Sequence, residues 1–318
     1  MMEDREGPRY RSFSRYLKER FGGVVYRVGV DAGFSCPHRD SREGRGCAFC
    51  DVEGSRAPYL GDVRGLEEQV RRAKGFLKAR YGASRFLLYF QAYTNTYGPV
   101  EELRRVYEAG LAAGEGEWVG LIVSTRPDYL PDEVLDLLAS YKARGLEVWV
   151  ELGLQSAFDE TLRRIRRGHT VAQWEDAVRR AGEAGLLRAA HLIAGLPGEG
   201  REAFWESARF VAESGVEGIK FHDLHLPVGA PLFQEYLRGE LSLLSRERYL
   251  EYVMGALERI RPDMVVMRLV TDTPPERRGV PGQYMPKGRF LRRLEDEMRR
   301  RGTRQGRLWV EVGGRKTR

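Results

Sequence analysis

Apolar runs and amphipathic stretches alternate along most of the chain. Six runs rich in β-branched, aromatic and Leu residues are nearly continuous, which is typical of parallel strands buried on both faces. They predict strands at residues 24–30, 84–90, 118–125, 146–156, 187–197 and 218–227.

The stretches between these runs have the spacing of amphipathic helices, with apolar residues three or four positions apart. Most of them end close to a glycine, the residue that most easily takes the left-handed conformation after a helix. The expected helices cover residues 66–81 and begin at Val100, Asp132, Ala172 and Glu202. Six strand–helix units in register predict an α/β fold, a partial (β/α)6 barrel of the TIM type.

The pattern changes after residue 230. The segments expected there are a helix at 246–260, a strand at 263–270, a loop rich in Pro and Gly at 271–288, an Arg-rich helix at 289–301 and a strand-like end at 307–312. We therefore expect three parts, a lead-in at residues 1–23, the barrel at 24–230 and a C-terminal α/β extension at 231–318.

Composition and charge narrow the class of protein. No stretch approaches the roughly 20 apolar residues of a membrane span, and the charged N-terminus lacks the apolar core of a signal peptide. We therefore expect a cytoplasmic protein with no membrane partner. The formal net charge is +7, from 53 basic and 46 acidic residues, which suits an anionic partner such as nucleic acid. Because Arg stands beside Glu and Asp through most helices, an ordinary solvated surface is the favoured interpretation.

All the cysteines lie in one loop after the first predicted strand, at Cys36, Cys47 and Cys50. An odd number of thiols in a chain without a secretion signal predicts a metal or a cluster rather than disulfides. Three thiolates can hold three irons of a cubane and leave the fourth iron open to a small molecule. Structural zinc, with His38 as a fourth ligand, is the alternative. The place of the loop at the C-terminal mouth of a barrel favours an active site.

The loop resembles the signature of the radical S-adenosylmethionine (SAM) superfamily, in which an aromatic residue, here Phe49, precedes the last cysteine. The ten residues between Cys36 and Cys47 exceed the three that are commonest there, and are similar to the gap in the radical-SAM subunit of Elongator. Six motifs in order resemble one uncharacterised bacterial family, the YhcC-like family, over roughly residues 10–310. They are CPHRDSREGRGCAFC, FQAYTNTYGP, VSTRPDYLP, ELGLQS, RRGHT and HLIAGLPGE.

The resemblance implies an enzyme with a [4Fe-4S] cluster and SAM as cofactors. Such enzymes cleave SAM reductively and abstract hydrogen from an unreactive carbon, with electrons from a reductant such as flavodoxin or ferredoxin. The substrate is not readable from the sequence, although kinship with Elongator suggests tRNA. The Arg-rich helix at 289–301 is then the segment expected to contact it, through Arg292, Arg293, Arg299, Arg300 and Arg301. The alternative is a non-catalytic barrel, stabilised by zinc or a cluster, that binds RNA or a protein partner.

The resemblance also implies roles for residues at the other strand ends. Superfamily members often hold the SAM amino group with a Gly-Gly-Glu element that this chain lacks, and Gln91, Thr94 and Asn95 are the expected replacements. Glu151 or Gln155 is expected to bond the ribose, and a salt bridge from Glu151 to an Arg or Lys inside the barrel is the alternative. Arg167 is expected to pair with the SAM carboxylate through its planar fork. The other expected cofactor contacts are Phe49, Ser124, Thr125, Gly195 and Leu196.

Polar residues near the end of the sixth strand are candidates for binding the substrate. Lys220 and His222 share one side of that strand, because side chains alternate. His225 follows in the same run, and Tyr284 lies in the later loop that could cover the mouth.

Overall fold

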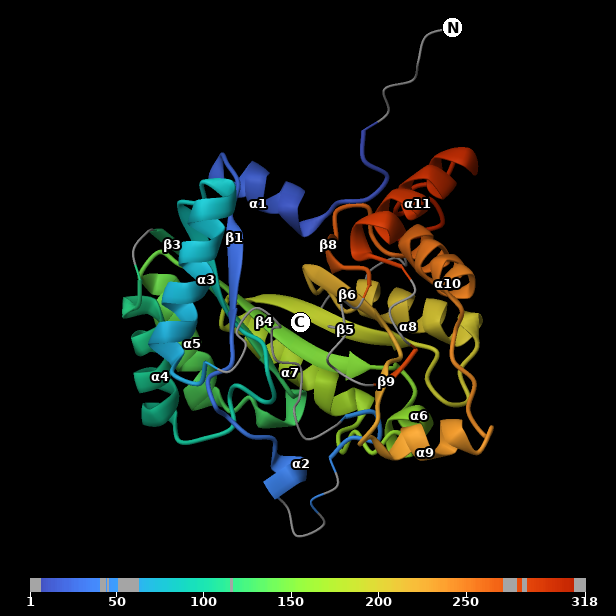
Figure 1. Cartoon of the computed structure of the whole chain (residues 1–318), viewed down its shortest axis with the longest axis horizontal. Helices are drawn as coiled ribbons and strands as arrows, with labels where there is room; N and C mark the ends of the chain where they lie inside the picture. Colours follow the sequence, from blue (N-terminus) through green and yellow to red (C-terminus); the bar gives the residue numbers. More distant parts are fainter. Residues whose placement is uncertain are drawn as a thin grey trace, which may run out of the picture.

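A computed structural model describes residues 7–40, 44, 46–50, 63–114, 117–270, 279–281 and 285–311. Its centre is one curled sheet of seven parallel strands, which forms a half-barrel with β1 and β8 at its edges (Figure 1). The strands, in their order in the sheet, are Tyr26–Val30 (β1), Arg85–Phe90 (β2), Glu117–Thr125 (β3), Glu147–Gln155 (β4), Leu187–Ala194 (β5), Gly218–Asp223 (β6) and Val265–Arg268 (β8). The α/β fold expected from the apolar runs is therefore confirmed.

Helices connect the strands and cover the outer face of the sheet (Figure 1). They are Leu66–Tyr81 (α3), Val100–Ala112 (α4), Asp132–Ala143 (α5), Asp159–Arg164 (α6), Val171–Glu183 (α7), Arg201–Glu213 (α8) and Arg246–Arg259 (α10). Local signals set their ends: α3 stops at Gly82, which is left-handed, and α7 begins with a capping box between Thr170 and Gln173. Within the described ranges, no helix has the length and apolar character needed to cross a membrane.

The N-terminal helix Phe13–Phe21 (α1) closes one end of the half-barrel. Its buried Phe13 and Leu17 pack against an apolar inner layer of the sheet that includes Trp149. The Trp149 ring meets Phe13 edge-on at 5.7 Å between centroids. Figure 1 shows α1 at one end of the strands and the short helix Pro37–Asp40 (α2), which carries the cysteine loop, at the other. The lead-in is thus part of the barrel core, and the site lies at the opposite, C-terminal end.

Three expectations for the second half of the chain are corrected. The run at 218–227 is not one strand, because it leaves the sheet after Asp223 and Leu226–Pro227 (β7) pairs antiparallel with Gly279–Val280 (β9). The strand expected in the extension, β8, pairs with β6 and becomes the seventh strand of the barrel sheet.

The strand-like end of the chain is the third correction. Residues 307–308 lie in a turn and 309–311 are irregular, and the N–H groups of 307–309 bond to nearby loop and helix carbonyls instead of a neighbouring strand. The Leu308 N–H, for example, donates to the Glu258 carbonyl of α10 at 2.7 Å. The helices Pro231–Leu237 (α9) and Lys287–Arg300 (α11) complete the described elements.

Candidate active site

The cysteine loop is held over the C-terminal end of the strands. Cys36 follows β1, and Cys47 and Cys50 follow α2. Ala48 anchors the loop, because its N–H donates to the Ile165 carbonyl at the end of α6 (2.9 Å). All three thiols are free and line one cavity inside the half-barrel. The strands therefore bring the cysteines to the end of the barrel at which α/β enzymes place their active sites.

One buried arginine faces the thiols. Arg167 Nη1 donates to Cys47 Sγ at 3.5 Å. A hydrogen bond from Cys50, together with the Arg167 charge, holds the pKa of Cys47 well below its ordinary value. The same thiol–thiol hydrogen bond and burial raise the pKa of Cys50. Cys47 is thus stabilised as a thiolate, the form that binds iron.

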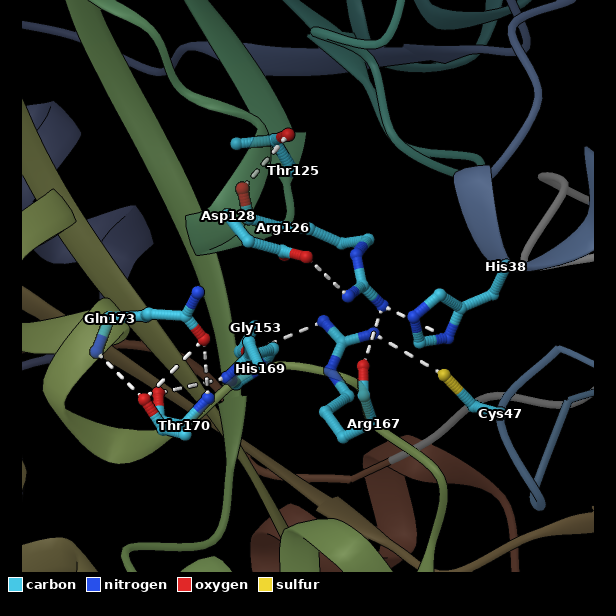
Figure 2. Close-up of polar contacts among 10 residues, drawn as sticks. All are labelled: His38, Cys47, Thr125, Arg126, Asp128, Gly153, Arg167, His169, Thr170 and Gln173. Carbon is cyan, nitrogen blue, oxygen red and sulfur yellow. Dashed lines mark hydrogen bonds and ion pairs between the residues drawn. The ribbon is translucent and has the colours of Figure 1, made fainter. Parts of the chain in front are cut away.

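A second buried arginine braces the first, as Figure 2 shows. Arg126 Nη1 donates to the Arg167 carbonyl at 2.7 Å, and its Nη2 donates to Asp128 at 2.7 Å. The His38 ring lies against this guanidinium, with 3.4 Å between Nδ1 and Arg126 Nη1. The Nε atoms of both arginines are buried and have no hydrogen-bond partner among the described residues. Each of the two guanidinium groups therefore still has an N–H group that can donate a hydrogen bond near the thiols.

Gly153 lets Arg167 approach β4. A Cβ at this position would lie 2.4 Å from Arg167 Nη2, so any larger residue would displace the guanidinium. The Gly153 carbonyl accepts from Arg167 Nη2 (3.1 Å) and contacts His169 Nε2 (3.0 Å). Burial and the Arg167 charge lower the pKa of His169 to about 4, so this imidazole is neutral and can donate from Nε2.

Deeper in the half-barrel, a polar floor spans six neighbouring strands. We define the polar floor as one inward-facing side chain from each of β2 to β6 and β8, namely Tyr89, Ser124, Glu151, His191, Lys220 and Arg268. It rests directly on the apolar layer that α1 covers, since Leu87, Ile122 and Trp149 stand two residues earlier on their strands.

Glu151 is the centre of the polar floor and is fully buried. Its Oε2 accepts hydrogen bonds from the Lys220 ammonium (2.6 Å), Tyr89 (2.6 Å) and Ser124 (2.6 Å), and lies 3.0 Å from His191 Nε2. Its Oε1 is buried and has no hydrogen-bond partner among the described residues. The salt bridge inside the barrel, weighed from the sequence as the alternative for Glu151, is therefore present, and one oxygen is still able to accept.

Burial governs the charges of the polar floor and of His222 next to it. It lowers the pKa of Lys220 to about 7, although Glu151 acts in the opposite sense. Burial and Lys220 lower the pKa of His191 to about 4, and burial and Arg268 hold the pKa of His222 well below its ordinary value. Burial raises the pKa of Glu151, but Lys220 and His191 outweigh it, so that carboxyl stays ionised. At neutral pH the two imidazoles are uncharged.

Most residues singled out from the sequence line this cavity together with the cysteines. They are Phe49, Gln91, Thr94, Ser124, Thr125, Glu151, Gln155, Arg167, Lys220 and His222. The structure thus brings side chains from the cysteine loop and from β2 to β6 around one space, as expected of a barrel mouth.

Four other predicted residues lie away from the cavity. Asn95 is used structurally, since its amide donates to the carbonyls of Phe90 (3.1 Å) and Ser124 (2.9 Å) and so joins the ends of β2 and β3. Gly195 and Leu196, in the turn after β5, line a separate cavity beside α6.

His225 is the fourth predicted residue that does not line the cavity. His225 follows the end of β6 and lies beside Gly279 of β9, because the chain leaves the sheet after Asp223. Tyr284 lies outside the described residues.

Sequence reasoning did not select Tyr89, Arg126 or Arg268. Tyr89 stands inside an apolar run that predicts only a strand, and Arg268 falls in the segment assigned to the extension. Arg126 directly follows Ser124 and Thr125 at the end of the third predicted strand, and only this position in the sequence could have marked it as a site residue.

The donor set fits a cubane cluster better than a zinc ion. Among the described residues, no three His, Cys, Asp or Glu side chains are arranged to hold a single metal ion. A cubane takes each thiolate on a different iron, whereas zinc needs its ligands to converge on one point. His38, the expected fourth zinc ligand, hydrogen-bonds to Cys47 and lies against Arg126, so it reaches one thiol only. Three thiols around a cavity with two buried arginines suit a cluster with one iron facing an anionic ligand group.

Comparison with known proteins identifies the family. Residues 36–211 match the family model of the radical SAM superfamily, and residues 216–300 match that of the Radical_SAM C-terminal domain. The chain therefore belongs to the radical SAM superfamily, as its motifs predicted.

Two relatives are similar over most of the chain. The uncharacterized protein YtqA of Bacillus subtilis (strain 168) is 38% identical over 310 residues, which cover 96% of this chain and 94% of the relative. Protein YhcC of Escherichia coli (strain K12) is 41% identical over 261 residues, which cover 81% of this chain and 82% of the relative. The predicted resemblance to the YhcC-like family is confirmed.

The relation to Elongator is confirmed at lower identity. A tRNA uridine(34) acetyltransferase of Methanocaldococcus jannaschii is 27% identical over 179 residues, which cover 55% of this chain and 31% of the relative. The solved structure of the archaeal Methanocaldococcus infernus Elp3 with an N-terminal deletion superimposes with a TM-score of 0.69 at 20% identity. The superposition covers 88% of this chain and 64% of the Elp3 chain, and it shows that the two share a fold.

Proposed function

We propose that this protein is a radical SAM enzyme that holds a [4Fe-4S] cluster on Cys36, Cys47 and Cys50 and binds SAM in the cavity beside them. The observation that carries the proposal is the convergence of three free thiols and the buried Arg167 on one cavity at the C-terminal end of a half-barrel. When bound, the cluster and SAM supply one-electron reduction and hydrogen-atom abstraction.

The chain's own residues stabilise the thiolate that would hold the cluster and offer polar groups for binding SAM. Arg167 stabilises the Cys47 thiolate, and its remaining donor capacity suits the SAM carboxylate. The free Oε1 of Glu151 can accept a hydroxyl hydrogen. Apolar packing beneath the polar floor closes the far end of the barrel, which limits the access of water to the reacting groups.

Anaerobic reconstitution with iron and sulfide tests the proposal. We expect a brown protein with about four irons per chain that cleaves SAM under dithionite. A colourless protein that binds one zinc and leaves SAM intact would support the non-catalytic alternative, a barrel that binds RNA or a protein partner.

Arg167→Ala is expected to weaken SAM binding while the cluster is retained. The loss of a charge-assisted contact costs about 1.5–3 kcal/mol, which corresponds to roughly tenfold or more in affinity. Equilibrium dialysis of SAM against reconstituted protein, with iron content measured in parallel, checks this. Arg163→Ala, an exposed arginine on α6, is the matched control. Equal SAM affinity in wild type and Arg167→Ala would assign the carboxylate contact to another arginine.

We propose tRNA as a substrate because one relative is a tRNA uridine(34) acetyltransferase, and the surface around the mouth suits tRNA better than α11. The helix α11 lies at the far end of the molecule from α2 (Figure 1). Its arginines are also largely neutralised: Arg300 pairs with Glu297 (2.6 Å) and Arg293 with Glu247 (3.0 Å). By contrast, Arg163 and Arg166 are exposed and stand within two residues of Ile165, whose carbonyl accepts from Ala48 of the cysteine loop.

We expect a tRNA titration to show affinity that falls steeply with added salt, because phosphate contacts release counterions. Arg163→Glu combined with Arg166→Glu should lower the affinity at least tenfold. Arg289→Glu combined with Arg292→Glu, two exposed positions on α11, should leave it unchanged. No binding of wild type at low salt would remove tRNA as the substrate.

A further inference from the structure

We propose that the polar floor is the binding site for the carboxylate group of a small-molecule co-substrate, distinct from the tRNA and held by Arg268 and Lys220. This inference rests on the proposed function, because it assigns the inner end of the same cavity to the co-substrate. It proposes that this small molecule carries a carboxylate, and that Arg268 on the seventh strand recognises it.

Arg268 faces the cavity and has no hydrogen-bond or ion-pair partner among the described residues. A shift in register between β6 and β8 after Ile219 sets Arg268 directly opposite Lys220. Both side chains line the cavity. Across the described part of the chain, the Arg268 guanidinium makes no ion pair or hydrogen bond, whereas the Lys220 ammonium is bonded to Glu151 and Tyr89. A partly buried, unpaired guanidinium on a cavity wall is a ready donor for an oxyanion.

No carboxylate of the polar floor pairs with Arg268. Glu151 is the one carboxylate among the described residues that line the cavity, and its Oε2 pairs with Lys220 rather than with Arg268. His191 and His222 are neutral for the reasons given above. Arg268 therefore leaves one positive charge in a partly desolvated space, where an uncompensated charge is costly. A ligand with a single negative charge removes that cost.

A carboxylate meets these requirements better than a phosphate. It carries one negative charge at neutral pH, whereas a phosphate monoester carries nearly two. Its two oxygens match the planar fork of Arg268, and one of them can also accept from Lys220. The SAM carboxylate belongs at the other end of the cavity, beside the cysteines and Arg167. Because Lys220 is only 1% exposed, a small molecule rather than a polymer backbone reaches this depth.

Trifluoroacetate is a probe for this site, since it is a monoanionic carboxylate whose fluorine NMR signal broadens on binding. We expect the oxidised holoenzyme with SAM bound to broaden the signal, and acetate to reverse the effect. Acetamide, a neutral molecule of the same shape, should not. Arg268→Gln should weaken the affinity at least tenfold, and Arg268→Lys should retain part of it. Arg292→Gln, an exposed arginine on α11, is the control and should bind as wild type does.

Three outcomes would overturn the inference. They are equal binding by wild type and Arg268→Gln, stronger displacement by inorganic phosphate than by acetate, and no binding by a wild type that holds its cluster and SAM. The last result leaves the proposed function intact. A wild type that holds no cluster would instead contradict the proposed function.

Discussion

Cys36→Ala, Cys47→Ala and Cys50→Ala are each expected to leave the protein without its cluster. Each thiolate holds one iron, and the sequence has no fourth cysteine that could replace a lost ligand. Iron content and the visible absorption of reconstituted protein, both expected to fall to less than about a tenth of wild type, check this. Cys47→Ala should show the largest structural effect, because it also leaves the buried Arg167 without its anion.

Ser35→Ala is the matched control, since it changes the same loop and no thiol. It should load iron as wild type does. Circular dichroism establishes that each cysteine variant is folded before its iron is counted. A full four-iron cluster in any one of the three folded variants would contradict the ligand assignment.

Lys220→Met is expected to lower the free energy of unfolding by about 3–5 kcal/mol, because it leaves the fully buried Glu151 carboxylate without its cation. Chemical denaturation of the apoprotein measures the loss. Adding Glu151→Leu should restore much of it, since the double variant has no uncompensated charge. Arg179→Ala, which breaks exposed ion pairs on α7, is the control and should have a far smaller effect.

The pH dependence of this loss follows from the two pKa shifts. Lys220 has a pKa of about 7 in the folded chain, below its ordinary 10.5, so between these values only the unfolded chain binds the proton and stability rises with pH. The lowered pKa of Glu151 likewise contributes stability that is present above its ordinary value of 4.5 and lost as the pH falls. In Lys220→Met, Glu151 loses its cation and its pKa rises. The gap between wild type and variant should therefore widen as the pH rises, and a gap independent of pH would show that Lys220 acts through packing alone.

The sequence by itself determined the strands and helices of the first half of the chain and the place of the site. Continuous apolar runs such as 118–125 and 146–156 predict buried parallel strands, because the pattern of side-chain burial is a local property. The three cysteines could be assigned in the same way, since they are the only ones in the chain and follow the first strand. Both features depend on residues close together in the sequence.

Only the tertiary structure decided which polar groups meet. Glu151 pairs with Lys220, 69 residues later, and the register between β6 and β8 places Arg268 beside that pair. Strand alternation predicts on which side a residue points, but not which residue it meets across a curled sheet. The same reason explains Asn95, whose amide is used in joining β2 to β3. Its neighbours in space, like those of Arg268, are set by strand pairing over long distances in the sequence and leave no local pattern.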